Sequence, residues 1–388
     1  MAIKILPRSN TELHGGKSQN HLKTPCYSVS SVVFISLLLL TACFRRQPLQ
    51  REFALGTVCV INLYENGSDK LYSRMFSRIR EIDRVMGAFP GEFEDIINNN
   101  GLIDNESDNS AVSALVSGVL AINRKAGIAP VKVRADLLEV LETALRYAEL
   151  SGGAFDPTIG PLVKLWGIGT DTQRIPSSDE IAAALQLVNY RDLLINHDKG
   201  TAFLRRKGME IDLGAIAKGY AADEAGRIAK EGGVKHGIID LGGNILALGW
   251  RVEKKKESLP WRVGVQNPFG NRGEYIGVLA VHDTSVVTSG VYERFFENEG
   301  TRFHHILSTT DGYPVDNGLL SVTIVTGRSM EADALSTSVF ALGFDRGKAL
   351  IDSIPGAHAV FVFADRSVKI TGGLSGIFTL TDDEFTLY

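Results

Sequence analysis

Two oxygen-bearing side chains near the C-terminus have the spacing of a small metal site. Asp333 and Thr337 stand four residues apart in EADALST (331–337), so a helix places both on one face. A carboxylate, a hydroxyl and a nearby backbone carbonyl form a hard oxygen set that suits Mg²⁺, which usually keeps waters and substrate phosphates as further ligands. Asp and Thr at this spacing are also common by chance, so an ordinary helix surface is the alternative.

A second segment, EIDLGAIAKGY (210–220), has the features of a phosphate site. A predicted strand ends at Asp212, a loop of small residues follows, and Lys218 lies in the first turn of a helix. Small residues let backbone groups approach a ligand closely, and a helix N-terminus and a lysine both favour phosphate. The alternative is a plain strand–loop–helix junction with a surface lysine.

The other candidate segments are less specific. GAFDPTIGP (153–161) holds Asp156 between an aromatic residue and a proline, which equally describes a rigid turn. DLGGNI (240–245) is glycine-rich after a strand, but it is not GxGxxG, and a Rossmann assignment fails that test. His304 and His305 are adjacent in a predicted strand, so they point to opposite faces and at most one can face a given site.

The elements that must position these residues are helices and antiparallel strands. Asp136, with Glu139 three residues on, has the pattern of a capping box at the start of a helix. The polar, turn-rich residues 91–118 predict a loop insertion. This mixture favours a single α+β domain over a doubly wound sheet. Periodicity predicts helices at 71–85, 136–150, 221–230 and 330–342, and strands at 54–63, 276–282, 319–326, 359–363 and 368–370.

Taken together and in order, these segments resemble the ApbE family, the FAD:protein FMN transferases. The resemblance implies one α+β domain over residues 53–388, with FAD in a cleft and Mg²⁺ on its pyrophosphate. Such enzymes move FMN from FAD to a Thr or Ser hydroxyl of a partner flavoprotein and release AMP, and some members hydrolyse FAD instead. The matching stretches are ALGT (54–57), GGAFDPTIGPLVKLWGIG (152–169), IDLGAIAKGYAAD (211–223), DLGGNILALG (240–249), WRVGVQNP (261–268), TSGVYERFF (288–296), RFHHI (302–306) and EADALST (331–337).

The resemblance also implies roles for individual residues. The metal ligands would be Asp333, Thr337 and the backbone carbonyl of Ala215. His305 would activate the acceptor hydroxyl or a water, and Lys218 would act on the pyrophosphate. Phe89 stands where the family has a stacking Tyr, and Leu307–Gly312 replaces an Asp-Pro-x-Thr-Gly-like turn, which leaves the balance of transfer and hydrolysis open. The FAD contacts would come from Leu55, Phe89, Ala154, Phe155, Asp156, Asp212, Lys218, Ser289, Gly290 and Ile306.

The N-terminus has the pattern of a lipoprotein signal. The apolar run VVFISLLLL (32–40) is about half the length that a membrane-spanning helix needs, and it follows a positively charged flank. LTAC (40–43) then resembles a bacterial lipoprotein cleavage box. Residues 1–42 would be removed, Cys43 would carry the lipid, palmitate included, and residues 43–52 would form a tether. The alternative is a buried strand or short core helix that ends in a cysteine.

The net charge and the cysteine content limit which partners and which bonds the protein is expected to form. Without the four basic residues and one acid of the leader, the formal charge falls from −4 to −7, which argues against nucleic-acid binding. Cys59 is the one cysteine left after cleavage and acylation, so no disulfide framework is expected. We expect an enzyme on the periplasmic face of the inner membrane that acts on a membrane-associated redox subunit. A non-catalytic flavin-binding lipoprotein and a thiamine-related lipoprotein are the alternatives.

Overall fold

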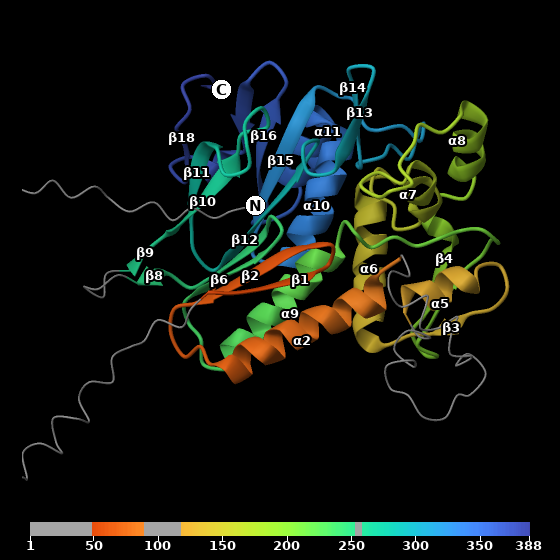
Figure 1. Ribbon diagram of the computed structural model, residues 1–388, viewed down its shortest axis with the longest axis horizontal. Coiled ribbons are helices and arrows are strands. Elements are labelled where there is room, and N and C mark those ends of the chain that lie inside the picture. The colour runs from red at the N-terminus through yellow and green to blue at the C-terminus, as the bar shows by residue number, and fades with distance from the viewer. Residues whose placement is uncertain (1–48, 89–117, 253–257) are drawn as a thin grey trace, which may run out of the picture.

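A nine-stranded sheet forms the centre of the computed structural model, which describes residues 49–88, 118–252 and 258–388 (Figure 1). Neighbouring strands are antiparallel except for the last pair, β17 and β19. The strand order is β1 (Gln50–Ala54), β2 (Thr57–Leu63), β6 (Gly237–Leu241), β7 (Asn244–Leu248), β12 (Thr284–Gly290), β15 (Leu319–Thr326), β16 (His358–Phe363), β17 (Ser367–Ile370) and β19 (Thr386–Leu387).

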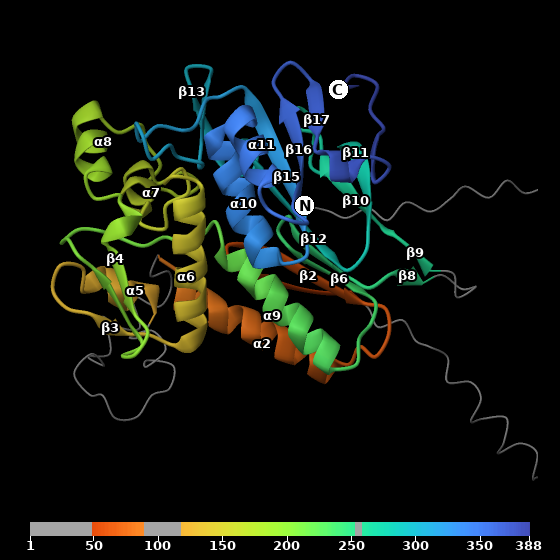
Figure 2. The same ribbon diagram turned by 180° about the vertical axis from the view of Figure 1, so that it is seen from behind.

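Alternate residues of the central strands enter two separate cores. Ile245 and Ala247 of β7 belong to one core, whereas Leu246 and Leu248 belong to the other. This alternation follows from the strand period of two, and burial on both faces explains why β6 and β7 are almost wholly apolar. Helices cover one face: α2 (Asp69–Met86), α9 (Ala217–Glu231), α10 (Ser329–Leu342) and α11 (Phe344–Asp352), while α6 (Ala135–Leu150) stands beside α10 (Figure 2).

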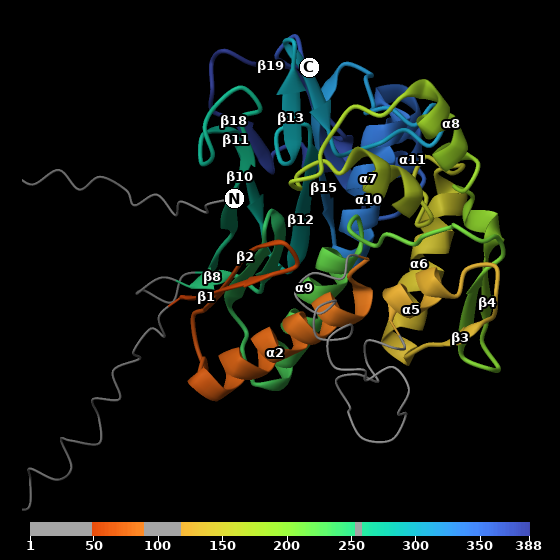
Figure 3. The same ribbon diagram turned by 45° about the vertical axis from the view of Figure 1, so that its right-hand side comes forward.

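The other face is covered by a small three-stranded sheet of β10 (Trp261–Gln266), β11 (Tyr275–Val281) and β18 (Phe378–Leu380). Two short hairpins project from the body: β8 (Arg251–Val252) with β9 (Ser258–Leu259), and β13 (Phe295–Asn298) with β14 (Thr301–His304). Beyond α6 lies a side region of short elements (Figure 3). They are α5 (Val119–Arg124), β3 (Val131–Lys132), α7 (Gly160–Trp166), α8 (Ser178–Leu185), β4 (Leu193–Asn196) and β5 (Thr201–Leu204).

The observed fold confirms the mixed α+β prediction, and most predicted elements are present within a few residues. Two differ. The strand predicted at 54–63 is a hairpin, because Leu55 and Gly56 form a left-handed turn between β1 and β2. The sheet therefore begins at Gln50, inside the segment assigned to the tether. The helix predicted from Ala221 begins at Ala217 instead, which places Lys218 and Gly219 in its first turn.

The capping box predicted at Asp136 is wrong. The N-cap of α6 is Arg134, without a side-chain cap, and Asp136 lies inside the first turn. Its carboxylate pairs with Arg134 and Arg78, while Glu139 pairs with Arg328. Tertiary ion pairs thus override the local capping pattern.

Several predictions concern residues outside the described ranges. They are the signal peptide, Cys43, Phe89 and the insertion up to residue 117. Within the described ranges, Cys59 is buried and unpaired in β2, and no helix combines the length and hydropathy needed to cross a bilayer.

Candidate functional site

The candidate site lies where the N-terminal halves of α9 and α10 touch. A Cβ atom on Gly219 would stand 2.3 Å from the Ser329 carbonyl oxygen and 2.6 Å from Met330 Cα, so only glycine permits this approach. The Gly219 backbone N–H donates to Asp333 Oδ2 at 2.9 Å. Two sequence segments over a hundred residues apart therefore meet by direct backbone contact.

Asp333 forms the floor of this site, and more exposed polar groups surround it. The Asp333 side chain is 5% exposed, whereas Lys218 is 24% exposed, with its Nζ 3.9 Å from Asp333 Oδ1. Burial raises the pKa of Asp333, and the Lys218 charge and the Gly219 N–H oppose that rise. Thr337 Oγ1 lies 3.3 Å from Ser289 Oγ, which also bonds Ser336 Oγ at 2.8 Å. The structure thus brings Lys218, Asp333, Thr337 and Ser289 together.

These oxygen atoms fit a small divalent cation. Asp333 Oδ1 lies 3.9 Å from the ammonium of Lys218, Asn244 also forms a side-chain hydrogen bond with Asp333, and Thr337 is partly exposed. None of the described residues donates a hydrogen bond to the Ala215 carbonyl. No cluster of three or more His, Cys, Asp or Glu side chains with metal-binding geometry occurs in the described ranges, so water and phosphate oxygens would have to complete the shell. That division of ligands is typical of Mg²⁺.

The loop before α9 is held in shape by its own polar groups. Asp212 Oδ1 accepts from the Gly214 N–H at 2.7 Å, and Lys218 Nζ donates to the Gly214 carbonyl at 2.8 Å. The loop is also fastened to the 153–161 segment, because the Asp212 N–H donates to the Pro157 carbonyl at 2.9 Å. The two glycine-bearing segments singled out from the sequence are therefore neighbours.

Asp156 ties its own loop to the side region. Its Oδ1 accepts from the N–H and the hydroxyl of Thr158, each at 2.7 Å, and Oδ2 accepts from the Tyr190 N–H at 2.8 Å. The observed role is structural, and a direct contact with FAD stays a prediction. Phe155 is 4% exposed and packs in the main core, while Ala154 beside it is half-buried, and the FAD contacts of both stay predictions.

The two histidines separate as the strand pattern predicts. His304 is buried, with Nε2 2.9 Å from the Val315 carbonyl and its ring edge-on to Phe340. His305 is partly exposed, and its Nδ1 lies 3.2 Å from the Arg294 carbonyl oxygen. Burial, followed by the charge of Arg294 and a smaller effect of Lys218, holds the pKa of His305 well below its ordinary value. The imidazole is therefore neutral near pH 7 and able to accept a proton.

The β1–β2 turn is held against two elements of the site. Leu55 has a positive φ of 54°, and its N–H donates to Asp83 Oδ2 on α2 at 2.8 Å. On the neighbouring β6–β7 hairpin, a Cβ on Gly242 would stand 2.3 Å from Thr57 Oγ1, so the two hairpin tips touch. Gly290 and Ile306 are both buried, and Ile306 belongs to the main core.

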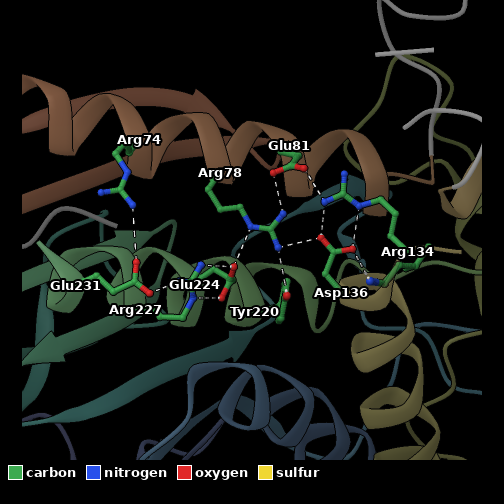
Figure 4. Close-up of polar contacts among 10 residues, drawn as sticks. Arg74, Arg78, Glu81, Arg134, Asp136, Tyr220, Glu224, Arg227 and Glu231 are labelled. Atoms are coloured by element: carbon green, nitrogen blue, oxygen red, sulfur yellow. Dashed lines mark hydrogen bonds and ion pairs between the residues drawn. The ribbon is translucent and has the colours of Figure 1, made fainter. Parts of the chain in front are cut away.

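An ion-pair cluster joins the helices that carry these segments (Figure 4). Arg78 on α2 lies at its centre, with bonds of 2.8–2.9 Å to Glu81, Asp136 and Glu224. Its guanidinium also donates to the Tyr220 hydroxyl at 3.3 Å. Because Asp136 belongs to α6 and Glu224 to α9, Arg78 fixes three helices relative to one another.

Sequence reasoning missed Arg78, Asp83 and Asp223, since nothing in the chain marks their partners. Asp240 was quoted only as part of a glycine-rich turn. It is 1% exposed, and burial raises its pKa to about 7 although its Oδ1 accepts from the Gly243 N–H at 2.9 Å. No ion pair to Asp240 occurs among the described residues, and its burial became visible only with the fold.

Comparisons with known proteins identify the family and the fold. The ApbE family model matches residues 55–361. An FAD:protein FMN transferase of Treponema pallidum is 36% identical over 351 residues, covering 88% of this chain and 91% of the relative. A protein of the same name from Klebsiella pneumoniae is 38% identical over 317 residues, covering 82% and 89%.

Solved structures show the same fold. The crystal structure of the ApbE protein from Thermotoga maritima superposes with a TM-score of 0.71 at 29% identity, covering 85% of this chain and 98% of that one. The flavin transferase ApbE from Vibrio cholerae gives a TM-score of 0.69 at 22% identity, with the same coverage of both chains. At that lower identity the likeness concerns the fold alone.

Proposed function

The chain belongs to the ApbE family, and on that premise we propose that it is an FAD:protein FMN transferase. It takes FAD as substrate, joins the FMN part to a Thr or Ser hydroxyl of a partner flavoprotein and releases AMP. The acceptor oxygen attacks the FMN phosphorus, and the pyrophosphate bond to AMP breaks. The names of the relatives support the activity, and the local geometry supports the chemistry.

The observation that carries the proposal is the meeting of Lys218 with Asp333, Thr337 and Ser289 at the α9–α10 contact. The buried carboxylate would hold Mg²⁺ together with Thr337 Oγ1 and the Ala215 carbonyl. When bound, the cation would neutralise charge on non-bridging phosphate oxygens. Lys218, in the first turn of α9, would bind a further phosphate oxygen, where the helix N-terminus also favours negative charge.

His305 is the proposed base. A residue that takes the acceptor hydroxyl proton must be neutral at working pH, and the lowered pKa of His305 meets that requirement. His304 is unsuited to this role because its Nε2 is bonded to a backbone carbonyl inside the protein. Asp212, Asp156 and Leu55 would hold the loops that shape the flavin site, and Phe89 would stack near the flavin ring.

The setting is also proposed. Lipidation of Cys43 would anchor the enzyme to the periplasmic face of the inner membrane, where a membrane-associated redox subunit is a suitable acceptor. Gln50, at the start of β1, follows Cys43 by seven positions, a span of at most about 25 Å. The domain would therefore work close to the bilayer surface.

The test is AMP release from FAD by the full chain with Mg²⁺ and an acceptor flavoprotein subunit, measured by chromatography. Asp333→Ala should abolish release, because it removes the one carboxylate of the proposed metal set. Asp345→Ala, at an exposed position in the first turn of α11, serves as the control and should release AMP at the wild-type rate. If the wild type releases no AMP with any divalent metal, the enzyme proposal fails and a non-catalytic flavin-binding protein remains.

A further inference from the structure

The helix α10 begins without a cap of its own. Its N-cap residue is Arg328, whose side chain makes no capping hydrogen bond. The first backbone N–H groups of a helix lack partners within the helix and need an acceptor from elsewhere. That acceptor comes from α9: Asp223 Oδ1 accepts from the Ser329 N–H at 2.8 Å, and Oδ2 accepts from the Met330 N–H at 3.0 Å.

The same relation holds in the opposite direction. The N-cap residue of α9 is Ile216, which cannot cap, and the Gly219 N–H in the first turn is accepted by Asp333 of α10. Each helix therefore caps the N-terminus of the other with one aspartate. The helix dipoles favour this arrangement, since each N-terminus faces a negative charge.

Asp223 and Asp333 thus hold the same α9–α10 junction, one from each helix. We propose that Asp223 is a positioning residue that fixes the approach of α10 to α9, and thereby the affinity of the Asp333–Thr337 face for a divalent cation. This inference rests on the proposed function for the identity of the cation face. Asp223 touches neither FAD nor the cation in this account, and it acts through the α10 backbone.

A second set of contacts supports the same junction from the sheet. Ser329 Oγ donates to Asn244 Oδ1 at the start of β7 and accepts from Ser285 Oγ of β12 at 2.9 Å. Ser329, Asn244 and Ser285 are each 0–1% exposed. The first residue of α10 is therefore held by a side chain of α9 and by two strands, while Asp333 follows only one turn later.

The C-terminal end of α10 offers a matched control. There Asn317 Nδ2 donates to the Phe340 carbonyl at 2.7 Å, and its Oδ1 accepts from the Leu319 N–H at 3.1 Å. Asn317→Ala removes two hydrogen bonds, one of them to the C-terminal end of α10 and the other to the start of β15. Asp223→Ala removes two hydrogen bonds at the N-terminal end of α10, where it meets α9. Both variants should lower the melting temperature.

The experiment measures Mn²⁺ binding to the full chain with ADP, which supplies a pyrophosphate but no flavin to transfer. Electron paramagnetic resonance reports the free Mn²⁺ during the titration. Asp223→Ala should weaken Mn²⁺ binding roughly 10- to 100-fold, the range for partners that orient metal ligands. Asp223→Asn, which keeps one acceptor oxygen, should fall between Asp223→Ala and the wild type.

Asn317→Ala should bind Mn²⁺ within about twofold of the wild type, since changes that do not touch a metal's supporting shell leave its affinity unchanged. Equal Mn²⁺ affinities of Asp223→Ala and Asn317→Ala would overturn the positioning role and leave the proposed function intact. A wild type that binds no Mn²⁺ with ADP would contradict both the positioning role and the proposed function.

Discussion

The contact at Gly219 gives the sharpest mutational prediction. In Gly219→Ala the new Cβ would meet the Ser329 carbonyl oxygen at 2.3 Å, whereas ordinary contacts begin near 3.4 Å. This oxygen and the other close atom, Met330 Cα, both belong to the backbone, so α9 and α10 must separate by about 1 Å. A misplacement of that size can cost on the order of 100-fold in rate. We therefore expect AMP release from FAD to fall about 100-fold.

Stability should change less than activity. Overpacking lowers the free energy of unfolding by roughly 1–3 kcal/mol, and the higher helix propensity of Ala than of Gly offsets about 1 kcal/mol of that loss. The control is Gly226→Ala in the same helix, where the new Cβ would meet only the end of the Leu246 side chain, which can rotate. Initial rates and melting temperatures of both variants are the assay. A Gly219→Ala enzyme as active as Gly226→Ala would refute the claim that this contact sets the site.

Two further predictions concern charges near the site. Arg78→Met should lower the free energy of unfolding by about 3 kcal/mol, because it leaves partly buried carboxylates unpaired. The control Arg74→Met should cost below about 0.5 kcal/mol, because the pair between Arg74 and Glu231 is long and exposed. Urea denaturation compares the two variants, and equal losses would contradict the central role of Arg78. The pKa of Asp240 is raised to about 7, so the folded state holds a proton that the unfolded state releases near pH 4, and the wild type loses stability as pH rises from about 4 to 7. Relative to the wild type, Asp240→Asn should therefore gain up to about 4 kcal/mol in the free energy of unfolding across that window, and a pH-independent difference would refute the assignment.

Local patterns predicted elements well where one face or one period decides the structure. The strand at 319–326 and the helix that carries Asp333 and Thr337 follow directly from apolar spacing. The adjacency of His304 and His305 predicted that at most one could face a given site, and His304 is buried whereas His305 is partly exposed. Asp333 and Lys218 were identified separately, by spacing and by loop composition.

Tertiary contacts decided the features that the sequence missed. Asp223 looks like any helical aspartate until α10 is docked against it, and Asp136 was assigned to a cap because Arg78 lies far away in the chain. Phe155 was identified only as a candidate FAD contact, and its burial in the core became visible only with the fold. The turn at Leu55 could not be predicted from the sequence, because the acceptor of its N–H is Asp83 on another element.

The most direct test of the central claim is the intact mass of an acceptor flavoprotein subunit after incubation with the full chain, FAD and Mg²⁺. The account predicts a mass gain of one FMN, matched by AMP release, and no gain with Asp333→Ala or when the acceptor hydroxyl is removed. AMP release in step with free FMN, without any gain in acceptor mass, would contradict transfer and make the protein an FAD hydrolase.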